Sequence, residues 1–202
     1  MIHEAIVLLR GHAALTSVGN LVASATVTLL KGTPNVLVDT GDCWQREELV
    51  DALAAQGVEP GQIEYVVLTH GHLDHVGNNN LFAHATFVLD NDVARDGEYW
   101  IHDFARGPFV IEVTGGGEPI QVVATPGHTD HDVSVVVRTA IGIVAVVGDL
   151  FEREGDWNDN AWQYWSKNVE LQQLSRDRML AAADFIIPGH GDGFVVTRDV
   201  TG

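Results

Sequence analysis

The chain has 202 residues, of which 46% are hydrophobic, and its formal net charge is −17 with the histidines neutral. This length and hydrophobic content predict one compact domain and exclude an intrinsically disordered chain. No run of about 18 apolar residues is present, which excludes a membrane-spanning helix. The acidic balance, with scattered Lys and Arg residues, disfavours tight non-specific binding to nucleic acid.

A single cysteine, Cys43, excludes an internal disulfide and fits a reducing compartment. We therefore expect the cytoplasm, or the nucleus in a eukaryote, and the N-terminus lacks the basic-then-apolar pattern of a signal peptide. Cys43 stands apart from the histidine-rich segments, so we interpret it as a small packed residue near a helix start.

The first half of the sequence predicts strands with a helix between them. Apolar and β-branched residues predict strands over residues 4–10, 21–30, 35–39, 65–69 and 86–89. A helix is expected over residues 44–56, where Leu49, Ala52 and Leu53 share one face and Gly57 ends it. Residues 90–107 are polar and aromatic with weak periodicity, which predicts a loop-rich insertion near the active-site mouth.

The aromatic side chains of that insertion have two interpretations. They line a substrate cleft or they pack against one another, and the sequence favours neither. The residues concerned are Tyr99, Trp100, His102 and Phe104.

The second half repeats the alternation of strands and helices. Strands are predicted over residues 109–113, 120–124, 133–138, 142–147, 184–187 and 194–197. One or two helices are expected within residues 161–183, with Ser166 as an N-cap. The alternation predicts an α/β fold with two sheets and helices outside. No linker or low-complexity tract interrupts the chain, so we expect a single domain over residues 1–202.

The segment His70-Gly71-His72-Leu73-Asp74-His75 follows the apolar run at residues 65–68. It places three histidines and one carboxylate within six residues at the predicted end of a strand. Imidazole and carboxylate together suit zinc, and also iron or manganese. This segment therefore predicts a metal site at the edge of a sheet.

Three further ligand candidates, His128, Asp149 and His190, each follow an apolar run of their own. Each lies on a glycine-containing turn, which lets the backbone bend sharply beside a metal. A lone buried His or Asp usually has a structural explanation. Three such residues downstream of the histidine cluster instead favour one shared site.

These motifs resemble those of metallo-β-lactamase superfamily hydrolases over nearly the whole chain. The resemblance implies an αββα metallo-β-lactamase sandwich, with two mixed β-sheets flanked by helices and two metals at one edge. It assigns His70, His72 and His128 to the first metal, Asp74, His75 and His190 to the second, Asp149 to both, and Asp39 to support of the metal loop. An aspartate at the shared position is typical of the branch with glyoxalase II, lactonases and RNA-processing nucleases.

A finer resemblance concerns residues 132–137, 147–153 and 183–191. These stretches are similar to a compact metallo-β-lactamase-domain-containing subfamily that is linked to cleavage of histone pre-mRNA. This resemblance implies a phosphodiesterase or endoribonuclease that acts on RNA.

Two divalent cations about 3.5–4 Å apart can lower the pKa of a shared water to near 7 and supply a bridging hydroxide. Asp149 would hold both ions, and Asp74 would accept the proton of the nucleophile; we therefore count both as catalytic. The sequence thus predicts a dinuclear-metal hydrolase, with RNA as the favoured substrate. A thioester or lactone hydrolase of glyoxalase II or lactonase type, acting on a small molecule, is the alternative that the acidic surface favours. A non-catalytic binding protein fits poorly because the ligand set is complete.

Candidate substrate contacts flank the ligand motifs. They are His131, Trp157, Asn160 and Trp162. For the aromatic residues among them, helix packing is an equal alternative. A homodimer is expected to supply binding surface that a compact monomer lacks, whereas His3, His12 and His84 are interpreted as ordinary surface or strand-end residues.

Overall fold

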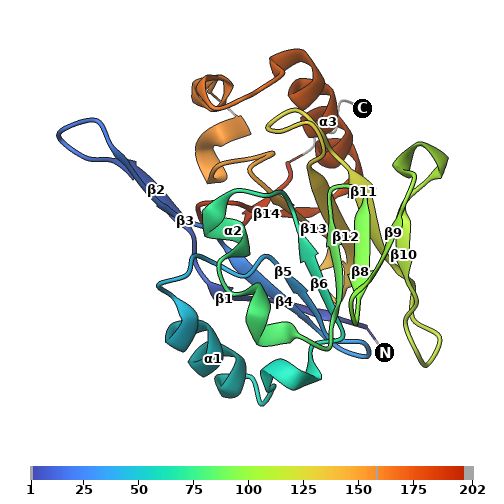
Figure 1. Cartoon of the computed structure of the whole chain (residues 1–202). Helices are drawn as coiled ribbons and strands as arrows, with labels where there is room; N and C mark the ends of the chain where they lie inside the picture. The colour runs from blue at the N-terminus through green and yellow to red at the C-terminus, as the bar shows by residue number, and fades with distance from the viewer. Residues whose placement is uncertain (1, 158, 198–202) are drawn as a thin grey trace.

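The computed structural model describes residues 2–157 and 159–197, which form two main β-sheets with helices outside them (Figure 1). The first sheet is antiparallel at both edges and parallel at its centre, where β5, β6 and β7 pair. Its strands, in spatial order, are β1 (Glu4–Leu9), β4 (Val27–Lys31), β5 (Val36–Val38), β6 (Tyr65–Leu68), β7 (Thr86–Leu89), β8 (Asp92–Arg95) and β9 (Glu98–Ile101).

The second sheet is also mixed, because β13 and β14 are parallel while its other pairs are antiparallel. Helix α3 (Val169–Ala182) makes the crossover that this parallel pair requires. The strands, in spatial order, are β10 (Phe109–Ile111), β11 (Ile120–Ala124), β12 (Val133–Thr139), β13 (Gly142–Gly148), β14 (Phe185–Pro188) and β15 (Phe194–Val195).

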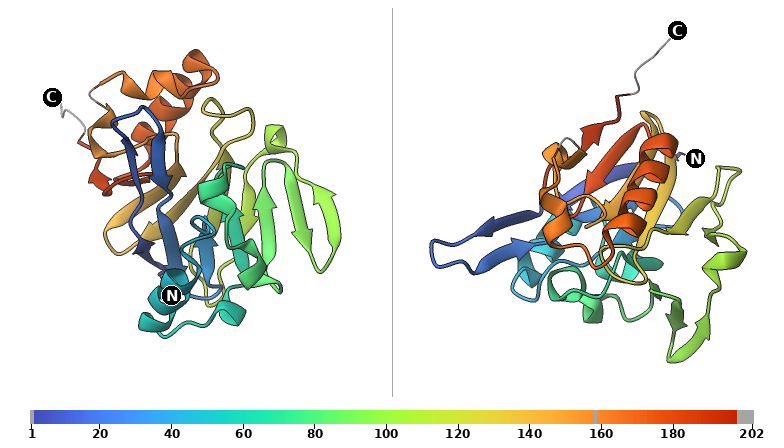
Figure 2. Two further views of the ribbon diagram at one scale, coloured as in Figure 1. Left: turned by 60° about the vertical axis from the view of Figure 1, so that its left-hand side comes forward. Right: turned by 90° about the horizontal axis from the view of Figure 1, so that it is seen from above.

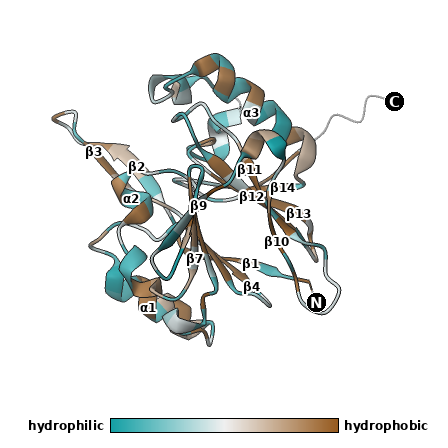
Figure 3. Cartoon of the chain, turned by 45° about the vertical axis from the view of Figure 1, so that its right-hand side comes forward, coloured by the Kyte–Doolittle hydropathy of each residue, from teal (hydrophilic) through white to brown (hydrophobic). Residues whose placement is uncertain are grey.

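Apolar side chains fill three layers. Valines such as Val67 and Val135 form the central layer between the sheets. Helix α1 (Arg46–Ala55) buries Leu49 and Leu53 against the outer face of the first sheet, and α3 buries Met179 against that of the second. Figure 2 and Figure 3 show the two helices on opposite outer sides, with hydrophobic strands between them. The predicted αββα sandwich is confirmed.

Short elements connect the strands. They are α2 (Leu73–Val76), η1 (Pro60–Gln62), η2 (Asn79–Phe82), η3 (Phe104–Arg106), η4 (Glu154–Trp157) and η5 (Ala161–Tyr164). Within the described ranges, no helix has the length and apolar character needed to cross a membrane.

The predicted strand over residues 21–30 is two strands in different sheets. Strand β3 (Leu21–Ser24) pairs with β2 (His12–Leu15), which the sequence did not predict, whereas β4 belongs to the first sheet. Between β3 and β4 the amide of Thr26 donates to the carbonyl of Gly189 (2.6 Å), which ties this bend to the loop after β14. The β2–β3 hairpin projects from the body of the molecule (Figures 1 and 2).

The prediction of a loop-rich insertion over residues 90–107 is wrong, because this segment contains β8 and β9. Asp96 and Gly97 connect the two strands with φ values of 51° and 84°. Positive φ at both residues is characteristic of the tight turn that two-residue hairpins prefer, and Asp-Gly is its strongest sequence signal.

The aromatic side chains of this segment divide between packing and exposure. The rings of His102 and Phe104 lie 4.6 Å apart, and Phe104 packs against the central core. Tyr99 and Trp100 are exposed on β9.

Two local predictions are also wrong. Asn168, rather than Ser166, caps α3, because its Oδ1 accepts from the amide of Leu171 (3.0 Å). The hydroxyl of Ser166 instead donates to the carbonyl of Gly127 (3.2 Å). Cys43 is exposed rather than packed.

Candidate metal centre and adjoining cleft

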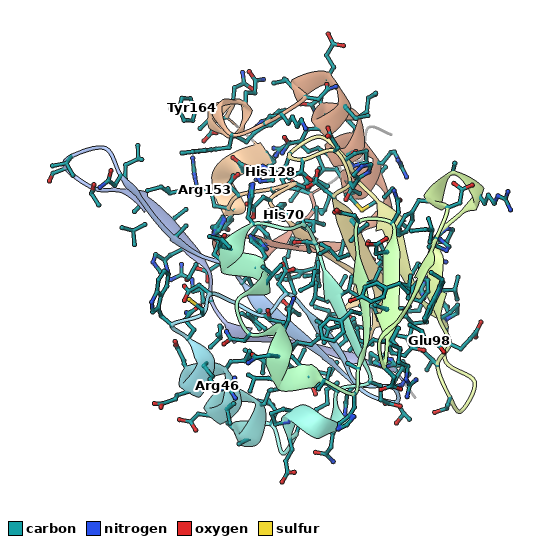
Figure 4. All side chains as sticks on the ribbon, viewed as in Figure 1. Arg46, His70, Glu98, His128, Arg153 and Tyr164 are labelled. Carbon is teal, nitrogen blue, oxygen red and sulfur yellow. The ribbon has the colours of Figure 1, made fainter. Side chains whose placement is uncertain are left out.

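The chain segments that follow β6, β11, β13 and β14 meet at one edge of the sandwich. They carry His70, His128, Asp149 and His190. Figure 4 shows His70 and His128 together although they come from different sheets, and their ring centroids are 4.8 Å apart. The sandwich therefore assembles residues that are far apart in sequence.

The first group of ligand atoms comes from His70, His72, His128 and Asp149, and these atoms lie within 4.8 Å of one another. His72 Nδ1 is 2.8 Å from His70 Nε2 and 3.2 Å from His128 Nε2. Asp149 Oδ2 lies 3.4 Å from His128 Nε2. Three imidazole nitrogens and one carboxylate oxygen thus converge.

The second group contains Asp74, His75 and His190. Asp74 Oδ2 is 4.0 Å from His75 Nε2 and 3.8 Å from His190 Nε2. Asp149 reaches this group as well, with Oδ1 at 3.2 Å from His75 Nε2 and Oδ2 at 3.2 Å from His190 Nε2. All seven ligands expected from the sequence therefore meet in one cluster, and Asp149 lies between the two groups.

The hydrogen-bonding pattern of this cluster fits divalent cations. His75 Nε2 and Asp149 Oδ1 are buried, and neither has a hydrogen-bond partner within the described part of the chain. A buried polar atom without a partner costs about 1–3 kcal/mol, so such atoms are expected to be satisfied in another way. Imidazole nitrogens and carboxylate oxygens that converge like this are the donor set that zinc and similar ions prefer.

Asp39 fixes the orientation of one ligand ring. Its carboxylate accepts from the amide of Thr69 (2.7 Å), from the Thr69 hydroxyl (2.8 Å) and from His75 Nδ1 (2.8 Å). Since His75 donates through Nδ1, Nε2 is the ring nitrogen that faces the cluster and would bind a cation in place of a proton. The position of Asp39 matches the supporting role expected from the sequence.

The ring of His190 is held in place through Nδ1, while its Nε2 faces Asp149. Its Nδ1 donates to the carbonyl of Ser24 (3.0 Å), at the base of the β2–β3 hairpin. Gly189 lies so close to Asp149 that a Cβ at this position would overlap the Asp149 carboxylate. Only glycine therefore fits beside the shared carboxylate.

The cluster strongly shifts the pKa values of its own groups. Burial opposes the charged form of Asp149, but the neighbouring His75 and His190 outweigh it and hold the Asp149 pKa well below its ordinary value. Burial likewise opposes the His190 imidazolium, yet the charge of Asp149 raises the His190 pKa to about 9. For His70, burial and the nearby His75 lower the pKa well below its ordinary value.

Glu152 is a candidate functional residue that the sequence reasoning missed. Its carboxylate lies 3.9 Å from both His128 Nδ1 and His190 Nε2, and it forms a third ligand group with Asp149 and His190. Burial and the charge of Asp149 raise the pKa of Glu152 to about 8. The only sequence signal is its place three residues after Asp149, on the same loop.

A cleft of about 150 Å³ opens beside the cluster. Its lining combines two residues of the cluster region with the hairpin and the segment after Asp149. The lining residues are Ala13, Ala14, Leu15, Leu21, Glu152, Arg153, Asp156, Ala161, Trp162, Trp165 and His190.

The four candidate substrate contacts lie in different places. Trp162 is buried and lines the cleft. Trp157 lines a separate hollow with Leu180 and Phe194. Asn160 and His131 are exposed and do not line the cleft. The structure therefore brings only Trp162 next to the metal cluster.

Comparisons with known proteins agree with this geometry. The family model of the Metallo-beta-lactamase superfamily matches residues 21–190. Metallo-beta-lactamase domain-containing protein 1 of Xenopus laevis is 47% identical over 198 residues, which covers 97% of this chain and 83% of the relative.

Solved structures show the same fold at low sequence identity. A metallo-beta-lactamase family protein from Thermus thermophilus has a TM-score of 0.67 at 20% identity, over 95% of this chain and 75% of that one. An N-acyl homoserine lactone hydrolase with N-hexanoyl-L-homoserine bound at its metal centre has a TM-score of 0.64 at 21% identity, over 94% and 93%. The family match, the close relative and the assembled ligand cluster identify the chain as a hydrolase of the metallo-beta-lactamase superfamily.

Proposed function

We propose that the protein is a dinuclear-metal hydrolase with zinc as its native metal, iron and manganese being the alternatives. His70, His72 and His128 would hold one cation, and Asp74, His75 and His190 the other. The observation that carries this proposal is Asp149, one buried carboxylate within 3.7 Å of ligand nitrogens from both groups. When bound, two such cations lower the pKa of water and stabilise developing negative charge.

Asp74 and Asp149 divide the carboxylate roles in this proposal. The side chain of Asp149 is 5% exposed, which suits a residue that holds cations, whereas that of Asp74 is 21% exposed. A carboxylate at the opening of the site is in a position to accept a proton from an incoming nucleophile. We therefore propose Asp74 as the general base.

We propose an RNA phosphodiester as the substrate, which makes the protein an endoribonuclease. The support is the close relationship to metallo-beta-lactamase domain-containing protein 1, together with the subfamily resemblance seen in the sequence. Paired metal sites suit in-line displacement at phosphorus, because two cations can stabilise both the attacking and the leaving oxygen.

A thioester or lactone hydrolase is the second candidate. The observation in its favour is the largely apolar lining of the cleft in a chain with a net charge of −17. A lactone hydrolase of the same fold binds an N-acyl homoserine product at its metal centre. A small neutral substrate would not be repelled by the acidic surface.

Cleavage of a short fluorescent single-stranded RNA by the zinc-loaded protein tests the first candidate. We expect cleavage that is lost in both His72→Ala and Asp149→Ala, prepared in the same way. Equal cleavage by the variants would identify a contaminant and contradict the RNA proposal. Hydrolysis of a thioester or lactone panel by the wild type alone would then support the second candidate.

We also propose that the protein acts in the cytoplasm or nucleus as a homodimer. Cys43 is a free, exposed thiol, which fits a reducing compartment. A second copy would add binding surface beside the cleft. Light scattering coupled to size-exclusion chromatography tests the dimer, and a monomeric mass at micromolar concentration would contradict it.

A further inference from the structure

We propose that the cleft beside His190 binds one flat ring that carries N–H donors, which in RNA is a nucleobase next to the cleaved phosphate. The inference rests on the proposed action on RNA and adds where a base is held. Its evidence is the lining of the cleft, the ion pairs that the nearby arginines already form, and the carboxyl group of Glu152, which accepts no hydrogen bond within the described ranges.

The cleft has apolar walls on two elements. Leu15 and Leu21 come from the β2–β3 hairpin, while Trp162 and Trp165 belong to the segment at η5. Both leucines are solvent-exposed, at 65% and 47%. Trp165 is 40% exposed and offers the accessible aromatic face. Aromatic side chains stack on nucleobases without regard to sequence, because every base has a π-face.

The indole wall is held in place. Trp162 is 2% exposed, and the guanidinium of Arg176 lies 4.4 Å from the centroid of its ring. Arg176 also donates to the carbonyl of Leu150 (2.8 Å), which follows the shared carboxylate Asp149. The wall and the metal cluster are therefore braced by the same side chain, so a ring in the cleft would lie at a fixed distance from the cluster.

The arginine side chains near the cleft already form ion pairs with carboxylates. Arg153, which lines it, contacts Asp159 at 2.9 Å, and Arg176 contacts Asp156 at 3.2 Å. Among the residues that the structure describes as lining the cleft, no unpaired lysine or arginine is left for a phosphate or carboxylate. The cleft is therefore suited to an uncharged part of the substrate.

Glu152 distinguishes a ring with N–H groups from an alkyl chain. Its carboxylate lies in the cleft and accepts no hydrogen bond within the described ranges; the nearest charged partners are 3.9 Å away. An alkyl chain packed on this carboxylate would bury it without a hydrogen bond, which is unfavourable. Whether ionised or protonated, Glu152 keeps an oxygen that can accept a hydrogen bond, and the exocyclic amine of a base would supply the donor, as acidic side chains accept from cytosine in protein–DNA contacts.

The size of the cleft limits what enters. Its volume of about 150 Å³ is below the roughly 300–1,000 Å³ of pockets that enclose a whole drug-sized ligand. One group of a larger substrate therefore enters while the remainder stays outside. A single base, with its phosphate directed toward the metal cluster, satisfies this condition.

Binding of cytidine 5′-monophosphate and of ribose 5-phosphate to the zinc-loaded protein, measured by calorimetry, tests the inference. The two probes share the phosphate and the sugar and differ in the base. We expect cytidine 5′-monophosphate to bind about tenfold more tightly, as one stacked base typically provides. Leu21→Asp should remove this difference, whereas Val18→Asp should keep it.

The two variants are matched. Both positions are exposed leucine or valine side chains on the same hairpin, at 47% and 79%, and both variants add the same charge. Only Leu21 lines the cleft. Because the ratio of the affinities for the two probes is compared, any general repulsion of phosphate by the new aspartate cancels.

Two results would overturn the inference: equal affinity of both probes for the wild type, or an unchanged ratio in Leu21→Asp. Tighter binding of hexanoate than of cytidine 5′-monophosphate would overturn it as well, in favour of an acyl chain. Failure of the proposed function is a separate result, namely a base-dependent affinity lost in Leu21→Asp without any RNA cleavage. RNA cleavage with equal probe affinities would instead remove only the inference.

Discussion

The two sheets support their share of the metal cluster in different ways. Asp39, at the end of the β5 strand, contacts the ring of a ligand, since His75 Nδ1 donates to it at 2.8 Å. Asp132, before β12, makes no hydrogen bond to a ligand ring within the described ranges. It instead accepts from the amides of Gly127 (3.0 Å) and Thr129 (2.6 Å), which shape the loop that carries His128.

Asp39 thus orients the ring of a ligand, whereas Asp132 shapes the loop that carries one. Both aspartates are buried, at 1% and 3% exposure, so burial does not distinguish them. His128 Nδ1 has no hydrogen-bond partner within the described ranges, whereas His75 Nδ1 is fixed. We therefore expect Asp39 to set the orientation of the His75 ring directly, and Asp132 to act on His128 through the backbone.

Asp149 lies between the two ligand groups, so replacing it should have the largest effect on metal binding. Asp149→Ala removes a carboxylate that reaches nitrogens of both groups, so we expect metal affinity to fall more than about 100-fold, beyond the loss for residues that only support a ligand. Metal content after dialysis measures it. Asp74→Ala, which alters one group only, should retain one of the two cations; equal losses in both variants would contradict the shared role of Asp149.

Arg176 on α3 holds the loop after β13 through contacts with Leu150 and Asp156, so its loss should destabilise the fold. Arg176→Ala leaves Asp156 buried without its partner at 3.2 Å and removes the donor to the Leu150 carbonyl. Breaking a buried ion pair costs about 3–5 kcal/mol, and urea unfolding measures this change. Arg178→Ala, on the exposed side of the same helix, is the control. Equal unfolding midpoints for the two variants would show that the pair does not brace the loop.

Asp39→Asn tests ring orientation in the first half. An amide at this position weakens the bond to His75 Nδ1 and presents an N–H group in place of an acceptor. Loss of such a supporting carboxylate typically costs about 10–100-fold in metal affinity or activity. Competition with a chromogenic zinc chelator measures the affinity, with Asp51→Asn on exposed α1 as the control. Wild-type affinity would place the orientation of His75 elsewhere.

The sequence was sufficient to predict where His70, His128, Asp149 and His190 meet, because each follows the end of a strand within four residues. The runs before His70, His128, Asp149 and His190 are buried strands of the two sheets. Strands β11, β13 and β14 run in the same direction, because β12 is antiparallel to both β11 and β13 while β14 is parallel to β13, so their carboxyl ends lie at one edge of the second sheet. The alternation of strands and helices predicted two sheets with helices outside, and the family resemblance implied the αββα sandwich.

Features that depend on contacts between distant segments could not be predicted in this way. Glu152 lies on the loop after β13, beyond Asp149, and joins the cluster only because this loop folds back on His128 and His190. The bend at Thr26 depends on a hydrogen bond to Gly189, at the other end of the chain. The hairpin at Asp96 is different, because its Asp-Gly turn is a local signal that the sequence does contain.

The pH dependence of stability should reverse when the metal is removed. In chelator-treated protein, the His190 pKa of about 9 exceeds the unfolded value of about 6.5, so its contribution is complete below pH 6.5 and lost as pH rises through 9. Glu152, with a raised pKa of about 8, adds a loss in the same direction because its buried carboxyl must ionise. We therefore expect the Tm of metal-free protein to fall between pH 6.5 and 9.

Zinc-loaded protein should behave differently over the same range. Zinc binding requires neutral histidines, so the stabilisation by zinc should grow as pH rises and be lost below about pH 5–6. Thermal unfolding across pH 4.5–9, with and without a chelator, separates the two cases. Parallel Tm profiles for the two forms, or retention of both metals at pH 4.5, would show that protons and metal do not compete for this cluster.

Asp132→Asn is expected to have the smallest effect on the metal and completes the comparison of the two halves. The remaining oxygen can accept from both the Gly127 and the Thr129 amides, which share Asp132 Oδ2, while the Thr129 hydroxyl loses its acceptor Oδ1; no ligand ring loses a hydrogen bond. Loss of a hydrogen bond to a charged group is worth about 1.5–3 kcal/mol, so unfolding should shift while zinc affinity changes less than in Asp39→Asn. Urea unfolding and zinc affinity are measured for both Asp132→Asn and Asp39→Asn. If Asp132→Asn lowers zinc affinity as much as Asp39→Asn, loop shape and ring orientation contribute equally, because a displaced His128 then weakens binding as much as a misoriented His75.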